Sequence, residues 1–214
     1  MSELRHEGRP SAESKVNGRT TKSGQLHARD GSEAIAAILD AALFAAQKHS
    51  TQRRKDADAS PYINHPLALA RVLATLGEVT DPVVLGAALL HDTVEDTKTT
   101  FSEIEARFGA EIANVVREVT DDKELEPQIR KRLQIETAAA KSPRAKLVKL
   151  ADKVCNLQDI LACPPADWPG TRKLDYFEWA ARVVDGLRGS NDALEDEFDR
   201  LLAQGRGEFG EAAA

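Results

Sequence analysis

The sequence predicts an all-α fold of about eight to ten helices. Apolar residues recur at helical spacing over most of the chain, and no stretch alternates between apolar and polar residues for more than a few positions. Prolines and capping residues mark the points where several of these helices are expected to begin. The 214 residues, 42% hydrophobic and 30% charged, suit one domain that buries a substantial core.

The expected helices follow from apolar spacing and from their stop signals. The first covers residues 34–48, where six residues recur on one apolar side: Ile35, Ile38, Leu39, Ala42, Leu43 and Ala46. A polar loop follows, and the second helix begins near Pro66 and ends at Gly77. Pro82 begins the third, which contains an apolar run over residues 83–90. Further helices are expected over residues 100–108, 110–119, 125–140, 143–161, 171–187 and 192–203.

Composition defines the expected domain and its surroundings. Residues 1–30 are polar and are expected to be a disordered extension, residues 31–205 to be the folded domain, and residues 206–214 to be a flexible tail. The net charge of -6 argues against a general nucleic-acid or anionic-membrane binder. We expect no transmembrane helix and no secretory signal, and reduced thiols at Cys155 and Cys163 favour a cytoplasmic protein. Homo-oligomerisation is left open.

The stretch His91-Asp92-Thr93-Val94-Glu95-Asp96 follows directly after the apolar run and is the first candidate for a functional site. It places one imidazole and three carboxylates at the end of a segment that is too hydrophobic for a surface. In a helical conformation Glu95 lies one turn beyond His91, and Asp96 one turn beyond Asp92. The alternative is a solvated, acidic helix end, so the interpretation depends on partners elsewhere in the chain.

His65 and Asp152 are two such partners, because each places a polar group where the helical pattern expects an apolar one. Taken singly, His65 could cap a helix start, and Asp152 could form an ion pair with Lys149 or Lys153. Taken together with His91 and Asp92, they supply two imidazoles and two carboxylates. Nitrogen and oxygen ligands without a thiolate suit manganese, and less well iron, zinc or magnesium.

A bound divalent ion would lower the pKa of a water molecule and polarise a phosphoryl oxygen. Glu95 and Asp96, one turn past the ligands, could position that water or accept its proton. The basic run Arg53-Arg54-Lys55 could bind phosphates or stack on a base, although a solvated loop is the alternative for this run. Hydrolysis of a phosphoester or pyrophosphate is the hypothesis in which all of these features serve one reaction.

These residues also resemble a known family. The order His65, His91-Asp92, Asp152 is similar to the signature of the HD-domain metal-dependent phosphohydrolases. The wider motifs resemble the small alarmone hydrolases, stand-alone relatives of the hydrolase half of the stringent-response synthetase/hydrolases, over residues 34–203. The motifs are Arg53-Arg54-Lys55, Pro61-Tyr62-Ile63-Asn64-His65-Pro66, Ala88 to Thr97 and Lys149-Leu150-Ala151-Asp152-Lys153 with Asn156-Leu157. Val119 to Lys123 and Asp175 to Ala180 resemble the animal-type members.

The resemblance implies an HD-domain helical bundle that removes the 3′-pyrophosphate from guanosine tetra- or pentaphosphate, with one Mn²⁺ ion. It assigns the metal ligands to His65, His91, Asp92 and Asp152, and the water-activating acids to Glu95 and Asp96. It assigns substrate contacts to Arg54, Lys55, Asn156, Arg172 and Tyr176. The alternatives are a phosphatase of another nucleotide, in particular one that converts NADPH to NADH, and a catalytically inactive nucleotide sensor, which would require the loss of a ligand or an acid.

Overall fold

The computed structural model describes residues 31–210, so the expected disordered extension at residues 1–30 lies outside the described residues. Every regular element in the described part of the chain is helical, which confirms the all-α prediction. The helices are α1 (Gly31–Lys48), α2 (Asn64–Thr75), α3 (Pro82–Leu90), α4 (Thr93–Asp96), α5 (Phe101–Phe108), α6 (Ala110–Val119), α7 (Pro127–Thr137), η1 (Ala138–Ala140), α8 (Pro143–Ala162), α9 (Gly170–Asp185) and α10 (Asp192–Gly210). None of the described helices is both long enough and apolar enough to cross a bilayer.

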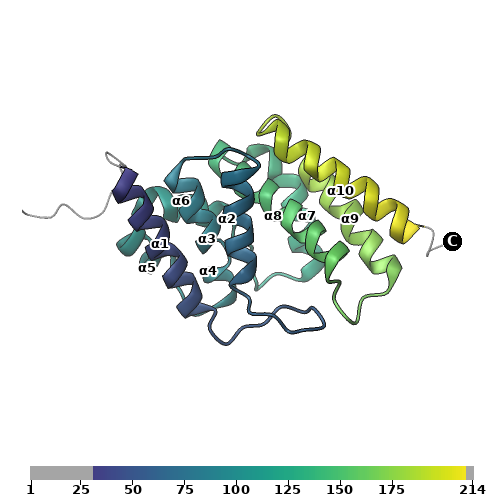
Figure 1. The fold of residues 1–214 in the computed structure, drawn as a ribbon, viewed down its shortest axis with the longest axis horizontal. Helices are drawn as coiled ribbons and strands as arrows, with labels where there is room; N and C mark the ends of the chain where they lie inside the picture. The colour runs from purple at the N-terminus through teal and green to yellow at the C-terminus, as the bar shows by residue number, and fades with distance from the viewer. Residues whose placement is uncertain (1–30, 211–214) are drawn as a thin grey trace, which may run out of the picture.

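Helix α3 is the centre of the bundle. Eight of its residues, from Val83 to Leu90, are buried, and the helix packs against α1, α2, α6 and α8. An apolar surface on all sides is what a helix enclosed by other helices requires. The long helix α8 also contacts α2 and α10, and α9 and α10 cover the other end of the bundle (Figure 1). The C-terminal end of α3 and the middle of α8 therefore meet inside the molecule.

Local signals explain where several helices begin. Asp81 accepts a hydrogen bond from the backbone nitrogen of Val83 (2.9 Å), and Pro82 occupies the first turn of α3. Thr100 caps α5 by accepting a hydrogen bond from the backbone nitrogen of Glu103 (3.2 Å). The Glu103 carboxylate, however, accepts from Lys48 on α1 (2.8 Å) and thus joins two helices.

The buried side of α1 differs from the side that apolar spacing suggested. Ile35, Leu39 and Leu43 are 61%, 63% and 54% exposed, whereas Ala41, Phe44 and Ala45 are buried. Apolar residues occur on almost every side of this helix, so periodicity predicts the helix but does not select the face. Small alanines let α1 approach α3 closely, and this explains why the alanine side is the buried one.

The C-terminal boundary also differs. A flexible tail was expected from residue 206, but α10 continues to Gly210 and only residues 211–214 lie outside the described part. Phe209 is buried, and its ring lies 5.7 Å from the Phe177 ring of α9. Gly205 lies directly against Phe177, where a Cβ atom would come within 2.1 Å of the ring. The absence of a side chain at Gly205 therefore permits close packing of α10 on α9.

Candidate metal centre and active-site pocket

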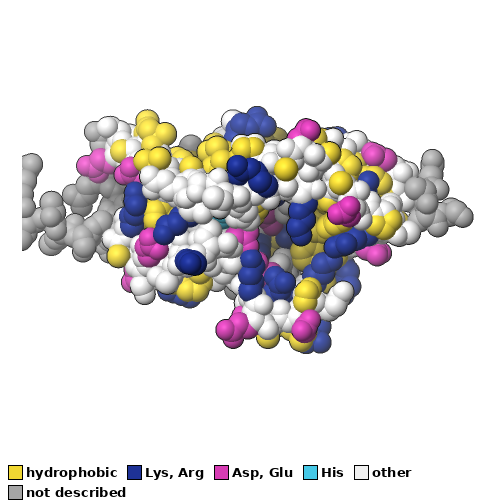
Figure 2. Space-filling model, turned by 90° about the horizontal axis from the view of Figure 1, so that it is seen from below, with side chains coloured by type: hydrophobic (Ala, Val, Ile, Leu, Met, Phe, Trp, Pro, Cys, Tyr) yellow, Lys and Arg dark blue, Asp and Glu magenta, His cyan; other side chains and the backbone are white. Residues whose placement is uncertain are grey.

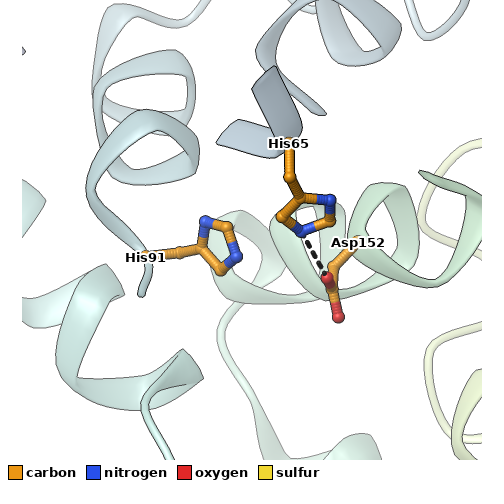
Figure 3. Close-up of side chains that lie close together, drawn as sticks. All are labelled: His65, His91 and Asp152. Carbon is orange, nitrogen blue, oxygen red and sulfur yellow. Dashed lines mark ion pairs between the residues drawn. The ribbon is translucent and has the colours of Figure 1, made fainter. Parts of the chain in front are cut away.

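Three predicted ligands converge at the centre of the bundle. His65 lies in the first turn of α2, His91 follows the last residue of α3, and Asp152 lies in the middle of α8. All three are buried, and one ligand atom from each lies within 4.8 Å of the others. Figure 3 shows the two imidazoles and the carboxylate turned toward a common point. The packing of α2, α3 and α8 thus brings together residues that are far apart in the sequence.

The His91 ring is oriented as a metal ligand would be. Its Nδ1 atom lies 2.8 Å from the carbonyl oxygen of Ala88, so Nδ1 carries the proton and donates it there. This leaves Nε2 as the atom with a free lone pair, and Nε2 is buried without a hydrogen bond. A hydrogen bond from one ring nitrogen to a backbone carbonyl is the usual way in which proteins fix the ligand nitrogen of a histidine.

Asp152 is held by several neighbours. Its carboxylate lies 3.3 Å from His65 Nε2 and accepts hydrogen bonds from Lys153 (2.9 Å) and Asn156 (2.8 Å). The ion pair with Lys153 that was considered as an alternative is therefore present, but it coexists with the contact to His65. Burial would raise the pKa of Asp152, but the charge of Lys153 and the hydrogen bond with His65 hold that pKa well below its usual value. Asp152 is thus an ionised carboxylate that faces an imidazole.

The same contacts act on His65. Burial alone would lower the pKa of this imidazole, but the nearby carboxylates of Asp152 and Asp159 raise it to about 9. The second ring nitrogen, Nδ1, is 3.8 Å from the Asp159 carboxylate, too long for a hydrogen bond. His65 therefore lies between two carboxylates, one in the buried cluster and one nearer the surface.

Asp92, the fourth predicted ligand, lies beside the group of three. Its Oδ2 atom is 2.9 Å from His91 Nε2 and accepts a hydrogen bond from the Tyr62 hydroxyl. Burial would raise the pKa of Asp92, but the adjacent His91 lowers it below its usual value. The stretch that contains Asp92 is therefore not a plain solvated helix end.

The donor set fits a divalent cation. Two imidazole nitrogens and a carboxylate oxygen face one buried point, and a second carboxylate is adjacent. The Nε2 atom of His91 is buried without a hydrogen bond and faces the Asp92 carboxylate at 2.9 Å, and a cation would bind both of these donors. Among the residues we describe, this site has the mixed nitrogen and oxygen donors that borderline and hard divalent metals accept.

Glu95 and Asp96 lie one turn further on and have partners outside the cluster. Glu95 accepts a hydrogen bond from the backbone nitrogen of Asp121 (3.1 Å) and lies 3.6 Å from Arg130. Its pKa is raised, chiefly because burial penalises the charged form. Asp96 accepts hydrogen bonds from Gln52 (2.8 Å) and from Lys123. Neither acid belongs to the buried group of His65, His91 and Asp152.

A pocket of about 620 Å³ opens beside the cluster. Its walls include His65 and Asp96 and four of the five predicted substrate contacts: Arg54, Lys55, Asn156 and Tyr176. Figure 2 shows a hollow in this face of the molecule with lysine and arginine side chains at its edge. This volume is within the range of pockets that hold small organic ligands, and the cations suit an anionic one.

The basic loop at the pocket is structured. The backbone nitrogen of Arg54 donates to the carbonyl of Ser60 (2.8 Å), and the Asp56 carboxylate accepts from both the backbone and the hydroxyl of Ser60. Arg54 itself forms an ion pair with Asp159. The alternative of a freely solvated loop therefore does not describe this segment, although Lys55 is exposed.

Arg172, the fifth predicted substrate contact, lines an adjoining cavity of about 450 Å³. Its guanidinium lies over the ring of Trp168, 4.5 Å from the ring centroid. Trp168 and Tyr176 line both cavities, so these two aromatic side chains form the shared wall between them.

Several contacts at the site were not predicted. They involve His49, Gln52, Lys123, Arg130 and Asp159, each of which touches a predicted residue or its immediate partner. Gln52 and Asp96 are separated by 44 positions, and a pairing of that kind leaves no trace in local sequence patterns. His49 is buried directly after α1, but this burial follows from the packed fold and not from the local sequence pattern.

Comparison with known proteins agrees with this geometry. The family model described as HD domain matches residues 41–174. A protein of Xenopus tropicalis named guanosine-3′,5′-bis(diphosphate) 3′-pyrophosphohydrolase MESH1 is 58% identical over 167 residues, which cover 78% of this chain and 93% of the relative. The MESH1 of Homo sapiens is 57% identical over 174 residues, which cover 81% of this chain and 97% of the relative.

The fold is also similar to a solved structure, described as a metazoan ortholog of SpoT that hydrolyses ppGpp and plays a role in starvation responses. The TM-score is 0.77 at 50% sequence identity, over 79% of this chain and 95% of that one. The expected HD-domain bundle is thereby confirmed, and the matched segment contains all four predicted ligands. The chain therefore belongs to the HD-domain family and groups within it with the MESH1 proteins.

Proposed function

We propose that this chain is a metal-dependent hydrolase that removes the 3′-pyrophosphate from guanosine-3′,5′-bis(diphosphate), giving GDP and pyrophosphate, and that it yields GTP from the pentaphosphate. The observation that carries the proposal is the convergence of His65, His91 and Asp152 beside a pocket lined with cations. Relatives with more than half of their residues identical carry the name of that activity, and the solved structure is described as hydrolysing ppGpp.

His65, His91 and Asp152 would hold the metal, with Asp92 as the fourth ligand. We propose Mn²⁺, because the donors are imidazoles and carboxylates without a thiolate. When bound, such an ion supplies a water of lowered pKa and polarises the phosphoryl oxygen. Lys153 and Asn156 keep Asp152 ionised and fixed in orientation, so the nucleoside contact assigned to Asn156 comes in addition to a bond that it already makes.

Glu95 and Asp96 would handle the proton of the attacking water. In the reaction a water oxygen bonds to phosphorus, the bond from phosphorus to the ribose 3′-oxygen breaks, and the 3′-hydroxyl forms. The raised pKa of Glu95 suits a base that takes up a proton during this step and then releases it. The hydrogen bonds from Asp121 and Gln52 hold the two carboxylates in place.

Arg54, Lys55, Arg172 and Tyr176 would bind the nucleotide. Arg54 is already paired with a carboxylate, that of Asp159, and a phosphate can replace that partner as the acceptor of the guanidinium. Tyr176 and Trp168 offer aromatic surface between the two cavities for a purine base. The described residues offer no feature that favours NADPH over a guanosine nucleotide, so NADPH serves as the comparison substrate.

The cytoplasm remains the proposed compartment. Both cysteines, Cys155 in the core and Cys163 at the surface, are free thiols, as expected for a reducing environment. An inactive sensor would lack a ligand or an acid, whereas the sequence contains every predicted ligand and both acids.

The test is a substrate panel with the full chain. Guanosine-3′,5′-bis(diphosphate) with Mn²⁺ is expected to yield GDP and pyrophosphate in equal amounts, and a chelator is expected to abolish both. The comparison of kcat/KM with that for NADPH identifies the preferred nucleotide. Absence of pyrophosphate release by protein that demonstrably contains metal would contradict the proposal.

A further inference from the structure

Gln52 and His49 form a partly buried chain of hydrogen bonds behind Asp96. Gln52 Nε2 donates to Asp96 Oδ2 over 2.8 Å, and the side-chain oxygen of Gln52 lies 2.6 Å from His49 Nδ1. Both residues follow the C-terminal end of α1, which is far in sequence from α4, where Asp96 lies. Asp96 has a second partner, Lys123, but that side chain is 48% exposed. The better-shielded support of the carboxylate therefore comes from Gln52.

The chemistry of the chain fixes the role of each atom. A carboxylate can only accept, so the amide nitrogen of Gln52 faces Asp96 and the amide oxygen faces His49. His49 must then donate from Nδ1, which leaves Nε2 without a proton or a partner in the neutral ring. This nitrogen is indeed buried with no hydrogen bond, and the residue is only 2% exposed. A phenylalanine would fill this space without an unpaired polar atom, so the Nδ1 donor is what the histidine contributes.

Tyr62 connects this chain to Asp92, the fourth predicted ligand. The His49 ring packs on the Tyr62 ring with centroids 4.8 Å apart, and the Tyr62 hydroxyl donates to Asp92. One small cluster at the end of α1 thus touches the supports of both Asp92 and Asp96. Each Asp96 oxygen keeps a further acceptor position, because a carboxylate has about four lone-pair sites and only two are occupied.

We infer that Gln52 and His49 are positioning residues that hold the Asp96 carboxylate in the orientation in which it accepts the proton of the attacking water. The inference rests on the proposed role of Asp96. It assigns to two residues outside the ligand set a function in the reaction rather than in metal or substrate binding. Gln52 acts directly on Asp96, and His49 acts through Gln52.

The test compares Gln52→Met and His49→Phe, which keep the volume and remove the donor. Gln52→Met is expected to lower kcat by about 10- to 100-fold, since misplaced general bases lose much of their contribution, and His49→Phe by about 3- to 10-fold. The KM for guanosine-3′,5′-bis(diphosphate), the Mn²⁺ dissociation constant and the Tm should remain close to those of the parent protein. Gln158→Met is the matched control, because Gln158 donates to the Glu197 carboxylate (3.0 Å) between α8 and α10. It should leave kcat unchanged.

A double-mutant cycle separates the positioning role of Gln52 from the role of Asp96 itself. If the chain acts through Asp96, Gln52→Met should lower kcat by less than about twofold in an Asp96→Asn background, because coupled residues are not additive. Full multiplicative losses, or a change in KM or Mn²⁺ binding in place of kcat, would overturn the inference. An unchanged kcat for Asp96→Asn itself would overturn the role of Asp96. A low kcat for Asp96→Asn with a normal kcat for Gln52→Met would overturn only the positioning role.

Discussion

The centre around His65, His91 and Asp152 and the interface between α9 and α10 bury their side chains in opposite ways. At the centre, the two imidazoles, the Asp152 carboxylate and Lys153 are buried together. At the interface, aromatic and aliphatic side chains interlock around Gly205, and Phe177 and Phe209 pack edge to face. The first region buries polar and charged side chains, and the second buries apolar side chains in close contact.

The distribution of unpaired polar atoms follows the same division. Within residues 31–210, the buried side-chain atoms that lack a partner belong to His49, His65, His91, Arg130 and Gln134. The histidines lie at the centre, whereas Arg130 and Gln134 contact the carboxylates of Glu95 and Asp121. Each such atom costs about 1–3 kcal/mol. The difference teaches that the unpaired polar atoms of the described residues lie in and around the candidate site, where a metal ion would satisfy the Nε2 atom of His91, while the described residues of α9 and α10 contain none.

The largest expected effect distinguishes the acids of the centre from acids elsewhere. Glu95→Gln and Asp96→Asn should each lower kcat by about 10²- to 10⁴-fold, the usual contribution of a general base. Glu178→Gln, which removes an exposed partner of Arg206 on α9, should leave kcat unchanged. Steady-state kinetics with guanosine-3′,5′-bis(diphosphate) measure all three. Equal losses in the three variants would erase the proposed distinction.

A smaller effect is expected for the cations of the pocket. Arg54→Gln should raise KM by about 10- to 100-fold, because hydrogen bonds to charged groups contribute about 1.5–3 kcal/mol. Arg53→Gln is the control, since Arg53 donates to the backbone carbonyls of Ser50 and Gln52 instead of the cluster. Initial rates over a range of substrate concentrations give both values. A larger rise in KM for Arg53→Gln than for Arg54→Gln would show that the wrong arginine had been chosen.

The packing region should respond in stability and not in activity. Gly205→Ala should lower the free energy of unfolding by about 1–3 kcal/mol, because the new methyl group overlaps the Phe177 ring. In Gly207→Ala, on the same helix, the new methyl group would meet no heavy atom within 4 Å. This variant should instead stabilise the protein by up to about 1 kcal/mol, because alanine has the higher helix propensity. Urea unfolding monitored by circular dichroism gives both values. Equal stabilities would mean that α10 does not pack tightly on α9.

The smallest effect concerns the two thiols. Cys155 is buried, and burial raises the pKa of its thiol to about 12, so it should react with a disulfide reagent only after unfolding. Cys163 is exposed at the pocket and should react in the native protein, more slowly when nucleotide is bound. A thiol titration with and without denaturant, repeated with Cys163→Ser, tests this. Rapid reaction of both thiols in the native state would contradict the packing around Cys155.

Sequence patterns predicted the ligand positions because each polar group interrupts an apolar helix. Asp152 lies among buried residues of α8, and His91 ends a helix that is buried on every side. The spacing of Asp92 and Asp96 was also predictable, and a backbone hydrogen bond of 2.8 Å joins them one turn apart. The roles assigned to these residues remain predictions until variants are measured.

Other features depend on tertiary contacts that local patterns do not contain. The buried face of α1 could not be predicted from its sequence, because alanines and leucines lie on nearly every side of this helix. The end of α10 depends on Phe209 meeting Phe177, and the support of Asp96 depends on Gln52, which is 44 positions away. Such pairs follow only from the packed bundle.

The central claim is that His65, His91, Asp92 and Asp152 bind the metal ion, whereas Glu95 and Asp96 accept the proton of the attacking water. Calorimetric titration of the metal-free chain with Mn²⁺ tests it most directly. The titration compares Asp152→Asn with Glu95→Gln, after Tm measurements have shown that both variants are folded. Asp152→Asn should weaken Mn²⁺ binding by more than the roughly 10- to 100-fold that loss of an outer partner causes, whereas Glu95→Gln should bind Mn²⁺ like the parent protein. Equal loss of binding in both variants would contradict the division.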